Sequence, residues 1–281
     1  MIPLTLGVRA HDFGKLPVAT LADRIAAHGL TSVQLAPAKA IAGFDGQPGS
    51  LSGGFARHVR DVFAARGIRI AVLGCYINLG DRDVAQRRPQ LERFKEHLRF
   101  ARDFGCSVVG TETGSVLSDF SRHPDNAGEE AYQTVLASAR DLAAEAERFG
   151  VCVGIEGVER YVISTPARLQ RLVADVASPN VQVIYDPVNL LSAVTAADPQ
   201  PLLQDALDRL GARIGIVHAK DFTLDSGRLE ERPAGEGSLD YRPLFRWLKT
   251  NKPGIDVLLE NTDPATIART VAYVRETYAE A

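Results

Sequence analysis

The stretch GEEAYQTVLASARDLAAEAERFGVCVGIEG, residues 128–157, decides the fold. Its first part is rich in alanine, carries apolar residues at helical spacing and ends at Gly150, a typical helix stop. A run of apolar and β-branched residues, 151–157, follows without a linker. This order predicts a helix over 128–150 that a glycine turn joins to a buried strand.

The same succession recurs along the whole chain. Nearly continuous apolar runs predict strands covered on both faces at 2–8, 32–36, 68–74, 106–112, 151–157, 181–186, 213–219 and 256–261. Residues 18–30 and 89–105 have helical periodicity. Three further glycines, Gly29, Gly67 and Gly105, come shortly before the predicted strands 32–36, 68–74 and 106–112. They correspond to Gly150, which comes before the strand 151–157.

Eight such units in 281 residues predict an α/β protein, a (β/α)8 TIM barrel that forms a single domain over 1–281. The rival fold is a doubly wound sheet, but no GxGxxG motif follows the first apolar run. The glycine-rich segment 39–54 follows the second predicted strand, where a barrel carries functional loops.

Composition excludes several classes of function. The net charge is −3, with 45% hydrophobic and 24% charged residues, so no basic surface for nucleic acid or membranes is expected. Three cysteines, an odd number, favour reduced thiols over disulfides. No apolar stretch approaches the roughly 20 residues of a membrane span, and the first residues lack signal-peptide features. We therefore expect a cytoplasmic protein.

Four consecutive predicted strands end in a side chain that can bind a metal ion. The runs VGIE, VIYD, GIVH and VLLE place Glu156, Asp186, His218 and Glu260 at these ends. Taken singly, each is more often a helix cap, an ion-pair partner or a buried bystander. Together, on neighbouring strands of a barrel, they would meet at one rim, where three carboxylates repel one another unless a cation lies among them. This donor set suits one divalent ion, Mn²⁺, Mg²⁺ or Zn²⁺.

The other strand ends offer candidates for substrate binding. Arg9 and His11 follow the first strand and could bind a phosphate or carboxylate. Glu112 ends the fourth strand and could contact substrate or a metal ligand, or pair with Arg9. Lys220 follows His218 by two residues, so it is either a substrate contact or half of a salt bridge.

Further assignments concern the end of the chain and the remaining histidines. Asp221 is expected to be structural, orienting Lys220 or a loop amide. Glu236 lies in a glycine-rich segment that we expect to form a lid over the substrate. We predict surface positions for His28, His58, His97 and His123.

The order Glu–Asp–His–Glu on the last four strands resembles the sugar phosphate isomerase/epimerase superfamily, the xylose-isomerase-like TIM barrels. The segments GIEGV (154–158), VHAKD (217–221), PAGEGSLDY (233–241) and LLEN (258–261) carry the resemblance. It implies a divalent metal ion held by Glu156, Asp186, His218 and Glu260. It also implies two catalytic glutamates, Glu156 and Glu260, on opposite sides of a carbohydrate substrate. The implied reaction is isomerisation or epimerisation, by proton transfer beside a carbonyl through an enediolate.

Two positions depart from this family's ketohexose 3-epimerases. Val162 stands where those enzymes have a second glutamate, and Asn189, an expected substrate contact, stands where many members have a histidine. We therefore favour a sugar, sugar acid or sugar phosphate isomerase over a ketohexose 3-epimerase.

Three other functions remain open at this stage. They are a metal-dependent dehydratase of a cyclic polyol or keto-acid, an endonuclease IV-like DNA repair enzyme, and a non-catalytic sugar-binding barrel. A homodimer or a homotetramer is compatible with each of them.

Overall fold

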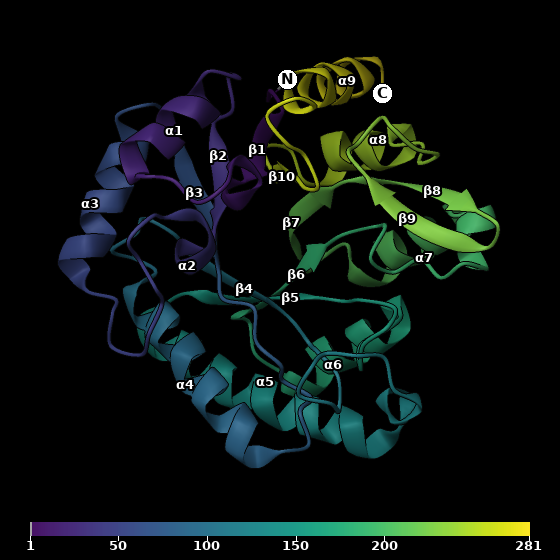
Figure 1. Cartoon of the computed structure of the whole chain (residues 1–281). Helices are drawn as coiled ribbons and strands as arrows, with labels where there is room; N and C mark the ends of the chain where they lie inside the picture. The colour runs from purple at the N-terminus through teal and green to yellow at the C-terminus, as the bar shows by residue number, and fades with distance from the viewer. Residues whose placement is uncertain (1) are drawn as a thin grey trace.

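The structure, a computed structural model, describes residues 2–281. Its centre is a closed barrel of parallel strands in the order β1-β10-β7-β6-β5-β4-β3-β2 (Figure 1). These strands are β1 (Thr5–Arg9), β2 (Ser32–Leu35), β3 (Arg69–Gly74), β4 (Val108–Glu112), β5 (Cys152–Glu156), β6 (Val181–Tyr185), β7 (Ile214–Ala219) and β10 (Asp256–Leu259). Each lies within or within one residue of a predicted run, so the TIM barrel is confirmed.

Helices form an outer ring around the strands, apart from the short α2 (Pro37–Ala40), which follows β2 at the carboxyl end of the barrel (Figure 1). The helices are α1 (Val18–Ala26), α2, α3 (Gly53–Ala64), α4 (Val84–Phe100), α5 (Glu129–Phe149), α6 (Pro166–Val176), α7 (Gln200–Leu210), α8 (Arg242–Asn251) and α9 (Ile267–Glu280). As predicted, α5 ends at Gly150, which adopts a left-handed conformation with φ 62°. The predicted helix 89–105 instead begins at Val84, because the Asp83 carboxylate accepts the amide N–H of Ala85.

The inside of the barrel is filled by a small apolar cluster, separate from the larger core between the strands and the helices. Its members are Ala71, Val72, Ile184, Ile216 and Leu258. Gly110 and Gly154 make room for this cluster, because a Cβ at either position would lie within 3 Å of Ile184 Cδ1. The floor under the carboxyl ends of the strands is therefore tightly packed.

One feature of the fold was not predicted. An antiparallel hairpin of β8 (Asp221–Asp225) and β9 (Arg228–Arg232) interrupts the connection from β7 to α8 (Figure 1). The two strands turn at Ser226 and Gly227, which both have positive φ. The hairpin starts immediately after Lys220, so it grows directly from the end of the seventh barrel strand.

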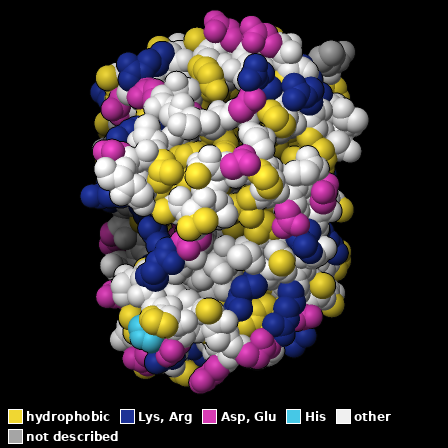
Figure 2. Space-filling view, turned by 90° about the vertical axis from the view of Figure 1, so that its right-hand side faces the viewer, with side chains coloured by type: hydrophobic (Ala, Val, Ile, Leu, Met, Phe, Trp, Pro, Cys, Tyr) yellow, Lys and Arg dark blue, Asp and Glu magenta, His cyan; other side chains and the backbone are white. Residues whose placement is uncertain are grey.

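The surface and the cysteines agree with the composition. Acidic and basic side chains are interspersed over the face shown in Figure 2. All three cysteines are free thiols, and two of them are buried. Within residues 2–281, every helix is too short or too polar to cross a bilayer.

Candidate functional site

The alternation of side chains along the barrel strands decides which residues point into the candidate site. Side chains two residues apart face the same side of a strand. Three members of the inner cluster stand two residues before a predicted metal ligand. These pairs are Ile184 and Asp186, Ile216 and His218, and Leu258 and Glu260. The three polar side chains therefore form the next layer up, at the carboxyl ends of the strands.

The same rule places two glutamates on the neighbouring strands. Gly154 and Gly110 face the inner cluster, and Glu156 and Glu112 follow them by two residues. Glu112 and Glu156 are directly paired in the register of β4 and β5. The carboxylates of both strands therefore join those of β6 and β10 at one rim.

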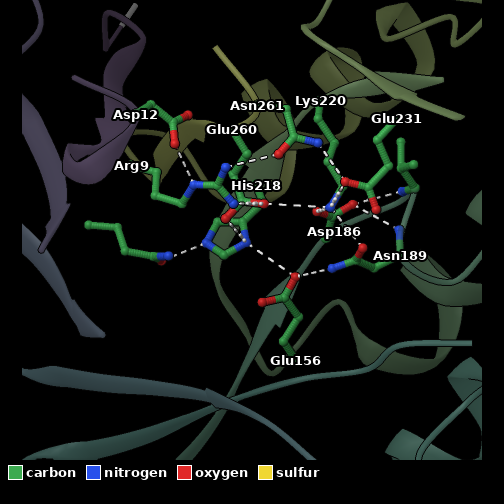
Figure 3. Close-up of polar contacts among 12 residues, drawn as sticks. Arg9, Asp12, Glu156, Asp186, Asn189, His218, Lys220, Glu231, Glu260 and Asn261 are labelled. Atoms are coloured by element: carbon green, nitrogen blue, oxygen red, sulfur yellow. Dashed lines mark hydrogen bonds and ion pairs between the residues drawn. The ribbon is translucent and has the colours of Figure 1, made fainter. Parts of the chain in front are cut away.

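The imidazole of His218 lies at the centre of this cluster (Figure 3). Its Nδ1 is 3.3 Å from Oε1 of Glu156 and 3.4 Å from Oε1 of Glu260. Ligand atoms of Glu156, Asp186 and His218 all lie within 4.8 Å of one another. Glu260 is outside this tightest group but reaches the same imidazole nitrogen. The structure thus brings the four predicted ligands together.

The orientation of the His218 ring is fixed from the other side. Its Nε2 lies 2.8 Å from Oε1 of Gln34, an acceptor, so Nε2 carries the hydrogen and donates it. Gln34 in turn donates from Nε2 to the hydroxyl of Tyr76 over 2.7 Å. This chain directs Nδ1 of His218 toward the carboxylates, which is the orientation that a metal ligand requires.

Asp186 has one oxygen engaged and one free of hydrogen bonds. Oδ1 accepts the amide N–H groups of Val188 and Asn189, at 2.8 and 3.0 Å. Oδ2 is buried and accepts no hydrogen bond, and it lies 3.1 Å from the ammonium of Lys220. A buried carboxylate oxygen whose one close partner is an ammonium, beside a histidine nitrogen and further carboxylates, fits a divalent cation.

Lys220 is the cation that the chain itself places among these acids. Its Nζ donates to Oδ1 of Asn189 over 2.7 Å and lies 3.3 and 3.5 Å from Glu231 and Glu260. Burial lowers the pKa of Lys220, but the carboxylates around it outweigh burial and raise it. The buried ammonium therefore stays charged at every physiological pH.

The charges in the cluster also change the other pKa values. Burial raises the pKa of Asp186 to about 6 and, with Glu156 and Glu260, that of Glu112 to about 7. Burial would lower the pKa of His218, but Glu260 and Glu156 raise it to about 9. Burial would raise the pKa of Glu260, but His218 and Lys220 lower it to about 2. Near neutral pH, Glu112 can therefore both donate and accept a proton.

Arg9 connects the first and last barrel strands above the cluster (Figure 3). Its Nε donates to Asp12 over 2.7 Å, one Nη donates to Asn261 over 2.9 Å, and the other lies 3.5 Å from Glu260. Arg9 thus holds the Glu260 carboxylate in place. The nearby His11 has a buried Nδ1 without a hydrogen bond. Burial and the charges of Arg9 and Lys39 lower its pKa to about 4, so it is neutral at pH 7.

A cavity of about 510 Å³ opens above the cluster. The cavity is lined by five of the predicted substrate contacts, Arg9, His11, Glu112, Asn189 and Lys220, and by the predicted metal ligand Glu260. Glu156, Asp186 and His218 are almost completely buried and are not lining residues. Asn189 bridges the two layers, because its Nδ2 donates to Oε1 of Glu156 over 2.6 Å.

Two of the expected positions differ from what the structure shows. Glu236 does not line the cavity and instead pairs with Arg269 of α9 at 2.6 Å. His97 is not a surface residue: it is only 7% exposed, its Nδ1 contacts the Arg93 carbonyl, and it lines the cavity. The inner face of α4, on which it lies, is covered by the barrel and the loops above it.

Some cavity residues were missed by the sequence analysis. Glu231 of the hairpin approaches Lys220, and its carboxylate also accepts a hydrogen bond from Asn261. Arg93 of α4 lines the cavity beside Tyr76. Neither stands at the end of a barrel strand, which is the signal that identified the others.

Comparisons with known proteins agree with the fold. The family model for the xylose isomerase-like TIM barrel matches residues 22–277. No curated protein sequence matches the chain significantly. Among solved structures, 3-keto-D-glucoside 4-epimerase from E. coli is 19% identical, with a TM-score of 0.72 over 98% of this chain and 99% of that one.

Two further structures are similar over almost their whole length. A D-tagatose 3-epimerase-like protein is 17% identical with a TM-score of 0.77, over 99% of this chain and 98% of that one. A xylose isomerase-like TIM barrel protein from Mycobacterium smegmatis, solved in complex with magnesium, is 18% identical with a TM-score of 0.70. That alignment covers 100% of this chain and 97% of the other.

Proposed function

The chain belongs to the xylose isomerase-like TIM barrel family, and we propose that it is a divalent-metal-dependent isomerase or epimerase of a carbohydrate. One observation carries the proposal. Four potential ligands, Glu156, Asp186, His218 and Glu260, meet at the carboxyl ends of four neighbouring strands, below a cavity large enough for a sugar.

The metal ion would be held by these four side chains, with Mn²⁺, Mg²⁺ and Zn²⁺ as candidates. When bound there, it supplies the positive charge that stabilises a substrate oxygen as negative charge develops beside the reacting carbon. Its site is formed by buried groups that lie under the cavity, so a substrate oxygen would approach it from above.

The proton transfers fall to the chain's own carboxylates. Glu156 and Glu260 contact Nδ1 of His218 from two sides, so they face a substrate bound above the ring from different directions (Figure 3). In epimerisation, one removes the proton from the carbon beside the carbonyl as a carboxylate, and the other enters as the carboxylic acid and delivers its proton to the opposite face. In isomerisation, the first returns its proton to the neighbouring carbon while a proton moves between the two substrate oxygens. Arg9 and Asn189 hold these two carboxylates in place.

Substrate oxygens would be bound by the polar groups that line the cavity. Lys220 offers a permanently charged ammonium, and Asn189 offers an amide between Lys220 and Glu156. Glu112 lies on the β4 side of the cavity and His11 on the β1 side. Substrate hydroxyls can bridge these groups, which fixes the reacting carbon relative to the two glutamates.

A second reaction is favoured by one specific observation. The Glu112 carboxyl lines the cavity, and burial and neighbouring acids raise its pKa to about 7, so it can carry a proton near neutral pH. A dehydratase needs such an acid to protonate the departing hydroxyl after a carboxylate has removed the neighbouring proton. A metal-dependent dehydratase of a polyol or keto-acid is therefore the alternative.

Solvent exchange separates the two reactions. Metal-loaded protein is incubated in D₂O with a panel of ketoses, ketose phosphates and keto sugar acids, and the products are analysed by NMR and mass spectrometry. We expect one deuterium on carbon in a recovered isomer; loss of 18 mass units from the substrate would favour the dehydratase instead.

Variants tie the exchange to the site. Glu156→Gln and Glu260→Gln should each lower the exchange rate by at least about 100-fold. Glu276→Gln, on the exposed face of α9, serves as the matched control and should leave the rate unchanged. Undiminished exchange in both site variants would refute the proposal.

A further inference from the structure

The cavity has a basic side on which the cations lack carboxylate partners. The lysines and arginines that line it are Arg9, Lys39, Arg93, Arg160 and Lys220. Arg9 and Lys220 belong to the ion pairs around Glu260 described above. In residues 2–281, no carboxylate lies within 4 Å of the charged groups of Lys39, Arg93 or Arg160, and Arg160 stacks on the ring of Tyr161 after β5. Lys39 and Arg93 both lie beside Tyr76. These two, with His11, form what we call the basic wall.

Tyr76 lies between the basic wall and the metal-ligand cluster. The ammonium of Lys39 stands 5.4 Å from the centre of its ring, and Arg93 donates to its carbonyl oxygen over 3.2 Å. Its hydroxyl points the other way, to Gln34, which holds His218. One tyrosine side chain therefore separates the two cations from the reaction centre, on the same cavity.

Arg93 has unused hydrogen-bonding capacity. Its Nε is buried and has no acceptor. It lies beside the thiol of Cys75, and burial raises the pKa of that thiol to about 12, so this neighbour is neutral. The guanidinium of Arg93 lines the cavity without a carboxylate partner, and a planar anionic group in the cavity is the kind of partner that a guanidinium binds well.

We propose that the basic wall, His11, Lys39 and Arg93, binds an anionic group of the substrate, a carboxylate or a phosphate. The inference rests on the proposed function and narrows its substrate class to sugar acids or sugar phosphates, to the exclusion of neutral ketoses. The carbonyl end of the substrate lies over the metal-ligand cluster, and the anionic end lies several bonds away, beyond Tyr76. Charge-assisted hydrogen bonds from Lys39 and Arg93 then set both its position and its direction.

One acid also lines this side of the cavity. Asp45 is exposed, makes no ion pair in the described part of the chain, and receives the amide N–H of Gln47. If the carboxylate of Asp45 neutralised the charges of Lys39 and Arg93, the basic wall would have no preference for an anionic substrate. The binding experiment decides between these two roles.

Unreactive analogues test the inference without any turnover. Binding of a hexitol, a hexonate and a hexitol 6-phosphate is measured by calorimetry at low and at high salt. We expect at least one of the two anions to bind about tenfold more tightly than the hexitol, with a preference that weakens in salt. A hexonate preference indicates a sugar acid as substrate, and a hexitol 6-phosphate preference indicates a sugar phosphate.

Variants locate the effect. Arg93→Gln and Lys39→Gln should each remove most of the anion preference and leave hexitol binding unchanged. Arg88→Gln, on an exposed position of the same helix and outside the cavity, is the matched control. Equal binding of all three analogues, no binding of any, or an anion preference that survives both variants would overturn the inference.

The analogue-binding experiment and the deuterium-exchange experiment can fail separately, so their outcomes distinguish the basic wall from the proposed reaction. If the anion preference depends on Arg93 and Lys39 but no substrate exchanges deuterium, the basic wall stands and the isomerase proposal fails. If a neutral ketose exchanges deuterium and no analogue shows an anion preference, the reaction stands and the basic wall fails.

Discussion

The protonation of His218 decides whether the ligand cluster can accept a cation. Its Nδ1 must give up a proton to become a ligand, and the two glutamates beside it raise its pKa to about 9. Below pH 9 the proton and the metal ion therefore compete for the same nitrogen. The apparent metal affinity should rise about tenfold per pH unit from pH 7 and level off above pH 9.

Calorimetry at pH 7.5 in two buffers with different ionisation enthalpies checks this prediction. We expect close to one proton to be released for each ion bound. A metal affinity that is the same at pH 7 and pH 9, with no proton release, would contradict the assignment of His218 as a ligand.

Gln34 is a positioning residue whose effect should appear in metal binding. It accepts the Nε2–H of His218 and is itself held by Tyr76. Gln34→Leu keeps the size of the side chain but removes the acceptor, so the ring loses its fixed orientation. Metal affinity should fall about 10- to 100-fold, as for other partners of ligating histidines. Gln47→Leu, an exposed residue, is the control, and an unchanged affinity in Gln34→Leu would exclude the role.

At the scale of residues, the sequence predicted that the four candidate ligands would meet, but it did not predict the groups that orient them. Asp186 and His218 end apolar runs, and that position is visible in the sequence. The pairing of Gln34 with His218 joins strands 184 residues apart, and only the closure of the barrel brings them together. Arg93 and Glu231 come from a helix and a hairpin, so strand ends gave no indication of them.

Among the elements, the β8–β9 hairpin depends on one buried carboxylate. Asp221 accepts the amide N–H groups of Phe222, Gly235 and Leu239, at 2.8, 3.1 and 2.9 Å. This confirms that it is structural. It fastens both the start of the hairpin and the segment that returns to α8.

Asp221→Ala leaves these amides without acceptors. The free energy of unfolding should fall by about 3 kcal/mol, since each buried unsatisfied donor costs about 1–3 kcal/mol. Urea unfolding followed by circular dichroism measures the loss. Asp225→Ala, at the exposed hairpin tip, should change it by less than about 0.5 kcal/mol. A similar small effect in both variants would show that the loop does not depend on Asp221.

The hairpin could have been found in the sequence. Residues 221–225 alternate polar and apolar side chains, and the pair Ser226-Gly227 that follows them is typical of a turn. The eight-unit pattern predicts one strand per unit, so it does not include this additional pair of strands. The start of α4 was harder to place, because Pro89 lies inside the helix and suggested a later beginning.

For the whole molecule, the repeat of strand and helix was enough to predict the barrel. Each strand is covered on both faces, which gives the continuous apolar runs that the sequence shows. The packing inside the barrel was not predictable in the same way. The packing inside the barrel depends on which large side chain lies opposite each glycine. The strand register decides these pairings, and the register is set only when the sheet closes.

That inner packing links stability to the site. A Cβ at Gly154 would lie 2.9 Å from Ile184 Cδ1 and 2.9 Å from Val108 Cγ1. Gly154→Ala should therefore lower the free energy of unfolding by about 1–3 kcal/mol. Because Glu156 and Asp186 lie two residues beyond Gly154 and Ile184, the strain should also weaken metal binding. Gly54→Ala, where a Cβ at the start of α3 would come no closer than 4.0 Å to Ser52 Oγ, should be neutral or stabilising.

A second substitution distinguishes overpacking from a general loss of stability. Ile184→Val removes the Cδ1 that the new Cβ would meet, at an expected cost of about 0.5–1.5 kcal/mol alone. In the double variant, the loss of stability should be smaller than the sum of the two single losses, and metal affinity should partly recover. Urea unfolding and metal titration of the four proteins measure both quantities. Simple additivity would mean that the barrel floor and the ligand layer above it are not coupled through this contact.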